Sequence, residues 1–144
     1  MGRLTRAGGL GEKTRHMNAP MDAAALEGLI DTYCAVWSEP DAGRRQRTLD
    51  EIWAENATYM DPRAHLTGSK ALCAHIGNVL AGRPGARIIR TSLPDFHHGL
   101  VRFAWQVVQA DGTLLPEGLD IAEISNDMKL LRIIGFFGPL APNR

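Results

Sequence analysis

The sequence predicts an α+β domain in which three N-terminal helices pack on one face of a curved antiparallel sheet. Apolar residues recur at helical spacing in the first half of the chain, and after Gly85 they recur at the spacing of strands. The segments between these elements carry Gly, Pro, Asn and Asp, which is typical of turns. Helices followed by a meander of strands favour one layer of helices against one sheet.

The three helices are predicted from capping residues and apolar periodicity. Asp22 and Asp41 are suitable N-caps, because an aspartate side chain can accept a hydrogen bond from the free N–H groups of the first turn. Pro40 stops the first helix, and Gly82 ends the third. The predicted helical segments are residues 22–37, 41–53 and 69–81.

Strands are predicted where the apolar period changes to two. Asp111-Gly112 is a strong hairpin signal, and Ser125-Asn126-Asp127 forms a second turn. Pro62 terminates a short strand that precedes the third helix. The predicted strands are residues 57–61, 88–93, 97–109, 114–124 and 129–137.

The strand at residues 97–109 is apolar on both of its faces. Phe103 and Trp105 share one face, whereas Leu100, Ala104 and Val108 share the other. A sheet that packs on helices with one face is normally polar on the opposite face. We therefore expect a partner to cover the outer face of this sheet.

The first twenty residues form a separate region by composition. Residues 1–20 hold four basic residues and one acidic residue, without apolar periodicity, so we expect a disordered basic tail before a domain at residues 21–144. The formal net charge of the whole chain is zero, which gives no general attraction to nucleic acid or to an anionic membrane. The sequence lacks the apolar run of a signal peptide or a membrane span, so a cytoplasmic location is expected.

Two aspartates lie within otherwise apolar strands. Asp61 ends the run Asn56-Ala57-Thr58-Tyr59-Met60, and Asp120 follows Gly118-Leu119. A buried carboxylate is costly unless it is paired, hydrogen-bonded or neutralised. Tyr33 lies on the apolar stripe of the first helix and would point toward the same interior. The three residues together suggest a polar pocket.

These motifs resemble those of the NTF2-like superfamily, with SnoaL-like proteins and ketosteroid isomerases as the relatives. The resemblance covers residues 21–138 and rests on Ala57-Thr58-x-x-Asp61-Pro62 between the second and third helices and on Gly135-Phe136-Phe137-Gly138 at the end of the last strand. It implies a cystatin-like cone, and a homodimer through the outer sheet face. It also implies that Asp61 is a base and that Tyr33 and Asp120 are donors to an oxyanion, an arrangement that moves a proton alpha to a carbonyl.

The resemblance further implies a small-molecule ligand that is apolar or aromatic and carries a carbonyl or hydroxyl group. We expect five further residues to line the pocket: Trp37, Tyr59, His75, Arg102 and Trp105. Other interpretations remain open at this point. Asp61 could fix a turn, Tyr33 could be a core residue, and Asp120 could form an ion pair with Arg102 or Arg132. The chain could then be a non-catalytic binder or a dimeric interaction domain.

No metal site or cofactor site is predicted. His97 and His98 are adjacent on a predicted strand and should point to opposite faces, and His65 and His75 lack zinc-site spacing. No glycine-rich phosphate loop is present. Cys34 and Cys73 fall on predicted helices and are expected to be small buried hydrophobic residues without a disulfide.

Overall fold

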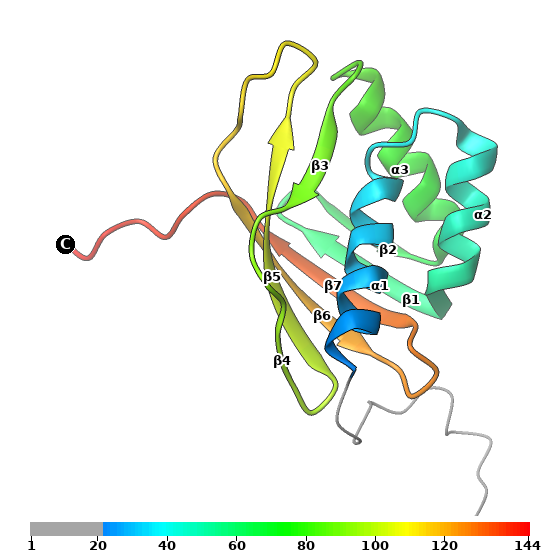
Figure 1. Cartoon of the computed structure of the whole chain (residues 1–144). Coiled ribbons are helices and arrows are strands. Elements are labelled where there is room, and N and C mark those ends of the chain that lie inside the picture. Colours follow the sequence, from blue (N-terminus) through cyan, green and yellow to red (C-terminus); the bar gives the residue numbers. More distant parts are fainter. Residues whose placement is uncertain (1–21) are drawn as a thin grey trace, which may run out of the picture.

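The computed structural model describes residues 22–144, and the expectations for the basic tail lie outside these residues. Three helices lie on one side of a strongly curved sheet, and the C-terminal segment runs away from it (Figure 1). The helices are α1 Ala23–Val36, α2 Ala42–Ile52 and α3 Ser69–Ala81. The strands are β1 Trp53–Asp61, β2 Ala64–Thr67, β3 Arg87–Arg90, β4 Asp95–His97, β5 Leu100–Val108, β6 Gly118–Ile124 and β7 Leu130–Phe136.

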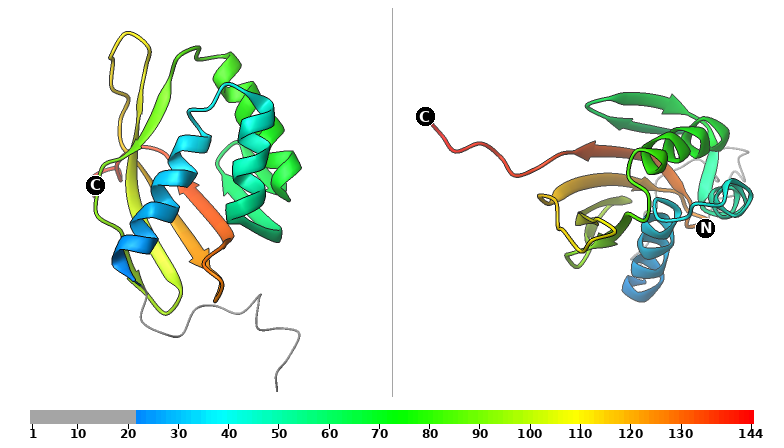
Figure 2. Two further views of the ribbon diagram at one scale, coloured as in Figure 1. Left: turned by 45° about the vertical axis from the view of Figure 1, so that its right-hand side comes forward. Right: turned by 90° about the horizontal axis from the view of Figure 1, so that it is seen from above.

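The helix boundaries follow from local sequence. The Asp22 side chain accepts a hydrogen bond from the Ala24 N–H, and Asp41 does the same for the Arg44 N–H, so both predicted N-caps are confirmed. The C-cap of α3 is Gly82, as predicted. In Figure 2, α2 and α3 lie together over one part of the sheet, while α1 lies beside them, over β3.

The sheet is mixed rather than wholly antiparallel, which corrects the prediction. Its strand order is β2-β1-β7-β6-β5-β3, with β4 paired to β5, and β1 runs parallel to β7. The chain between β1 and β7 contains α3 and the whole meander. A connection of this length does not force its two strands to be antiparallel, whereas a short hairpin does. Strand β2, which pairs with β1, was not predicted.

The strand predicted at residues 97–109 begins later than expected. His98 and Gly99 both adopt positive φ values, of 48° and 75°, and form a tight turn between β4 and β5. The prediction that His97 and His98 point to opposite faces of one strand was therefore wrong. Their Nδ1 atoms lie 3.1 Å apart at the turn.

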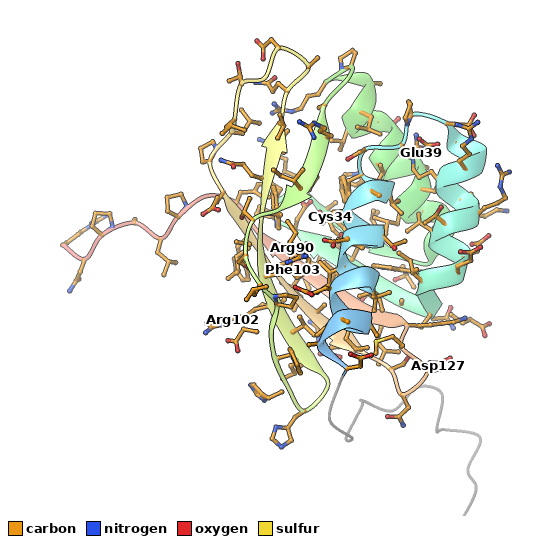
Figure 3. All side chains as sticks on the ribbon, viewed as in Figure 1. Cys34, Glu39, Arg90, Arg102, Phe103 and Asp127 are labelled. Carbon is orange, nitrogen blue, oxygen red and sulfur yellow. The ribbon has the colours of Figure 1, made fainter. Side chains whose placement is uncertain are left out.

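The inner face of β5 is the one that carries Phe103 and Trp105. Val101 and Phe103 are buried in the core, and Figure 3 shows Phe103 close to α1, whereas Arg102 points outward to solvent. The same alternation holds on β6, where Gly118, Asp120, Ala122 and Ile124 are all buried. The sheet thus presents Asp120 to the helices.

A buried arginine joins α2 to α3. Arg45 is 4% exposed, and its guanidinium donates to the backbone carbonyls of Glu39 at 3.0 Å, Pro40 at 3.2 Å and Cys73 at 3.0 Å. A side chain on Gly77 would lie 2.9 Å from the same guanidinium, so the glycine leaves the room that Arg45 needs. The guanidinium therefore fixes the α1–α2 loop and α3 in one arrangement.

We expect Arg45→Met to lower the free energy of unfolding by about 2–4 kcal/mol, because it leaves several backbone carbonyls without their charged donor. Urea unfolding at constant pH measures the loss. Arg44→Met is the matched control, since the Arg44 side chain is 73% exposed and lies 3.8 Å from Glu39; a change below about 0.5 kcal/mol is expected there. An Arg45→Met variant as stable as the control would contradict this role.

Candidate functional site

A cavity of about 420 Å³ lies between α1, α3 and the inner face of the sheet. Its volume is within the range of about 300–1,000 Å³ that is typical of small-molecule sites. Most of its wall is apolar or aromatic, with a few polar side chains. The side chains with polar groups that line it include Tyr33, Tyr59, Asp61, His75, Trp105 and Asp120.

Asp120 on β6 lines the cavity and is 6% exposed. Its Oδ1 accepts a hydrogen bond from the Trp105 indole N–H at 2.8 Å. The Trp105 ring lies across Gly118 on the neighbouring strand, where a Cβ atom would come within 2.2 Å of the ring. The absence of a side chain at Gly118 thus allows the indole to lie flat and reach the carboxyl group.

The environment of Asp120 favours its neutral form. Burial is the largest influence and raises the pKa of Asp120 to about 7, against the opposing effect of the Trp105 hydrogen bond and with a further contribution from the charge of Asp61. Among residues 22–144, no arginine pairs with Asp120: Arg102 bonds Asp95, and Arg132 lies 3.8 Å from Glu123. The structural ion pair considered from the sequence is therefore absent.

Asp61 lies at the end of β1 in a different environment. It is partly exposed, and its two oxygens accept hydrogen bonds from the Tyr59 hydroxyl at 2.5 Å and from the Arg63 backbone N–H at 2.7 Å. Burial and this hydrogen bond raise the pKa of Tyr59 well above its ordinary value, so the phenol remains a donor. Asp61 therefore fixes a turn through the Arg63 bond and also faces the cavity.

Gly135 on β7 separates the two carboxyl groups. Asp120 is the register partner of Gly135 on one side, and Asp61 follows the Met60–Ile134 pair on the other. A Cβ atom at Gly135 would lie 2.9 Å from Asp120 Oδ1 and 3.6 Å from Asp61 Cβ. The two aspartates therefore lie on either side of a single strand, and because Gly135 has no side chain, none lies between them.

Tyr33 comes from α1, opposite the sheet. It is 3% exposed and stacks on Trp53, with ring centroids 6.3 Å apart. Burial, followed by the charge of Asp120, raises the pKa of Tyr33 well above its ordinary value, while the Trp37 side chain acts in the opposite direction. The phenol is therefore neutral and able to donate a hydrogen bond near Asp120.

Aromatic rings form two walls of the cavity. Trp37, Tyr59 and His75 lie together on one wall, with ring centroids 5.4–6.0 Å apart. Trp105 and Phe137 meet edge to face at 6.1 Å on the other. Such walls suit a planar or alicyclic apolar ligand, because ring faces and edges supply contact area with little conformational entropy to lose.

Seven of the eight residues singled out from the sequence line this cavity: Tyr33, Trp37, Tyr59, Asp61, His75, Trp105 and Asp120. The expectation that Arg102 lines it was wrong. Arg102 lies on the outer face of β5, where its Nε donates to Asp95 at 2.7 Å, because even-numbered residues of β5 point away from the helices. The sequence interpretation missed Arg83, Arg87 and Phe137 as lining residues, which lie at loops and strand ends where no periodicity marks them.

The Cys34 thiol also lines the cavity and is poorly suited to act as a nucleophile. Burial raises the pKa of the Cys34 thiol to about 12, so its reactive thiolate form is scarce. Within residues 22–144, no three His, Cys, Asp or Glu side chains come together as a metal site would require.

In the same part of the chain, none of the helices combines the length and hydropathy of a membrane-spanning segment.

The fold is similar to that of several solved structures. A candidate isomerase of the SnoaL-like family from Agrobacterium tumefaciens strain C58 is 28% identical over 81% of this chain and 99% of its own, with a TM-score of 0.76. The chain belongs to the NTF2-like superfamily. A candidate ketosteroid isomerase from Kribbella flavida superposes on this NTF2-like protein with a TM-score of 0.62, at 16% identity over 88% of this chain and 87% of its own.

A candidate SnoaL-like polyketide cyclase from Jannaschia sp. CCS1 also shares the fold, with a TM-score of 0.59 and 9% identity over 82% of this chain and 90% of its own. At such low identity this likeness and that to the Kribbella protein concern the fold alone. The sequence of this NTF2-like protein matches no family model and no curated protein. Its chemistry therefore has to be argued from the cavity.

Proposed function

We propose that this NTF2-like protein is a cofactor-independent enzyme that moves a proton next to the carbonyl group of a small apolar or aromatic substrate, as isomerases and cyclases do. The observation that supports this most is the pair of carboxyl groups on either side of Gly135 in one ligand-sized cavity. Their environments differ, and two carboxyl groups with different environments can divide the roles of base and donor.

In the proposed reaction Asp61 is the base and takes the proton from the carbon next to the carbonyl. The electron pair of the broken C–H bond forms a carbon–carbon double bond, and the π pair of the carbonyl moves onto its oxygen, which becomes negative. Asp120 and Tyr33 are proposed to donate hydrogen bonds to this oxygen, and Asp61 returns the proton to the same or a neighbouring carbon.

The protonation of Asp120 supports its role as donor. Burial raises the pKa of Asp120 to about 7, so the protonated carboxyl group is populated at neutral pH, where an ordinary aspartate is ionised. A negative oxygen bound beside it raises the pKa further, because two negative charges at close range disfavour each other. Asp120 thus keeps its proton, and can donate a hydrogen bond, while the negative oxygen is bound.

Deuterium exchange tests the proposal. In D₂O at neutral pH, the protein should accelerate exchange of the hydrogens next to the carbonyl of 2-tetralone, measured by proton NMR. 2-Naphthol, a planar phenol that resembles the enol, should inhibit this exchange in competition with the ketone. An exchange rate equal to that in buffer, with 2-naphthol bound, would instead favour a protein that holds such ligands without turnover.

The outer face of the sheet is proposed to form a homodimer. Three of its side chains, Leu119, Ile121 and Ile134, are apolar and partly exposed, and Phe136 is 52% exposed beside Leu119. Light scattering at micromolar concentration should report about twice the monomer mass of 15.7 kDa. Leu119→Lys should shift the protein to the monomer, whereas Leu140→Lys, at a side chain 97% exposed in the C-terminal segment, should not. A monomeric wild-type protein would contradict this proposal.

A further inference from the structure

Three arginines from three separate segments line the opening of the cavity. Arg63 lies between β1 and β2, Arg83 follows the C-terminus of α3, and Arg87 begins β3. Each of the three is exposed to solvent and also lines the cavity. The opening is therefore cationic on more than one side.

Among residues 22–144, these three arginines form no ion pair with a carboxylate, whereas four other arginines do. Arg44, Arg90, Arg102 and Arg132 each lie within 4.0 Å of an Asp or Glu oxygen. No such pair involves the three arginines at the opening within residues 22–144. The Arg63 guanidinium lies over the Phe137 ring instead, 5.9 Å from its centroid.

The cavity is consequently polarised along its length. Its only lining carboxyl groups are Asp61 and Asp120 among the described residues, and Asp120 is buried whereas the three arginines are exposed. Aromatic and aliphatic side chains make up most of the rest of the wall. Unpaired guanidinium groups beside a low-dielectric wall attract anions, and their planar donors match a carboxylate.

We propose that the substrate carries a carboxylate at the end opposite its carbonyl group, held by Arg83 and Arg87 with Arg63 nearby. This inference rests on the proposed function, since it assumes that the carbonyl end lies against Asp120 and Tyr33. The apolar or aromatic ligand with a carbonyl or hydroxyl group that is expected from the sequence is thereby narrowed to an amphipathic keto acid.

Two matched ligands test the inference. 2-Naphthol and 6-hydroxy-2-naphthoic acid share one ring system and one hydroxyl, and only the second has a carboxylate at the far end. Isothermal titration calorimetry at pH 6 and low salt should give about tenfold tighter binding of the acid. This preference should shrink severalfold in 0.5 M salt, because exposed charges are screened.

Substitutions test whether the arginines at the opening of the cavity cause the preference for the acid. Arg83→Gln combined with Arg87→Gln should abolish the preference for the acid and leave the affinity for 2-naphthol unchanged. Arg102→Gln, on the outer face, should leave both affinities unchanged. Equal binding of the two ligands by the wild-type protein, or a preference that survives the double substitution, would overturn this inference but not the proposed function. Failure of 2-naphthol itself to bind would overturn the proposed function and the inference with it.

Discussion

Asp61→Asn should slow deuterium exchange of 2-tetralone by about 100-fold or more, because the amide cannot accept the proton that the carboxylate takes. The substitution preserves size, and the asparagine oxygen can still accept the Arg63 N–H bond that holds the β1–β2 turn. Proton NMR in D₂O measures the rate, and circular dichroism checks that the variant is folded.

Two controls separate the loss of a base from a loss of structure. Asp61→Asn should bind 2-naphthol at least as tightly as the wild type, since a negative charge near the phenol oxygen has been removed. Asp95→Asn, which alters an exposed carboxylate on the outer face, should exchange at the wild-type rate. Retention of more than a tenth of the wild-type rate by Asp61→Asn would contradict its role as base.

Asp120→Asn should change how stability depends on pH. The pKa of Asp120 is about 7 in the folded protein, against 3.8 for the ordinary group. The contribution of the Asp120 carboxyl group to the free energy of unfolding is therefore fully present below pH 3.8 and is lost as the pH rises through 7. Between these pH values the carboxyl group ionises readily only in the unfolded state. At about 1.4 kcal/mol for each pKa unit, the complete loss is on the order of 4 kcal/mol.

Urea unfolding at pH 5 and at pH 8 measures this effect. The wild type should lose about 2–3 kcal/mol more than Asp120→Asn between the two pH values, since the asparagine does not ionise and the other groups are common to both proteins. Equal losses in the two proteins would show that Asp120 is ionised in the fold at both pH values.

Elements of the fold that depend on neighbouring residues could be predicted from the sequence. The caps at Asp22 and Asp41 and the turn at Asp111-Gly112 involve bonds between residues at most four positions apart. The parallel pairing of β1 with β7 could not be predicted, because it joins segments separated by most of the domain. Nor could the role of Arg45 be predicted: it is one of three arginines in α2, and only its contacts with the α1–α2 loop and with α3 distinguish it.

The candidate site was partly accessible to sequence reasoning for a physical reason. Asp61 and Asp120 interrupt apolar runs, and a carboxyl group in such a position needs a special environment. Arg102 was misplaced because both faces of β5 are apolar, which leaves the direction of each side chain undetermined by the pattern. The bond from Trp105 to Asp120 and the space at Gly118 and Gly135 arise only when β5, β6 and β7 are aligned.

The proposed reaction depends most on an Asp120 carboxyl group that carries its proton at neutral pH and can act as a donor in the same cavity as the acceptor Asp61. Carbon-13 NMR of the side-chain carboxyl groups, titrated from pH 3 to pH 9, measures the pKa of Asp120 directly. The spectrum of Asp120→Asn identifies its resonance as the one that disappears. We expect a midpoint near 7 in the free protein and a higher one with 2-naphthol bound. A midpoint near 4 in both states would mean that the buried carboxyl group is ionised, and would contradict the proposed division of roles.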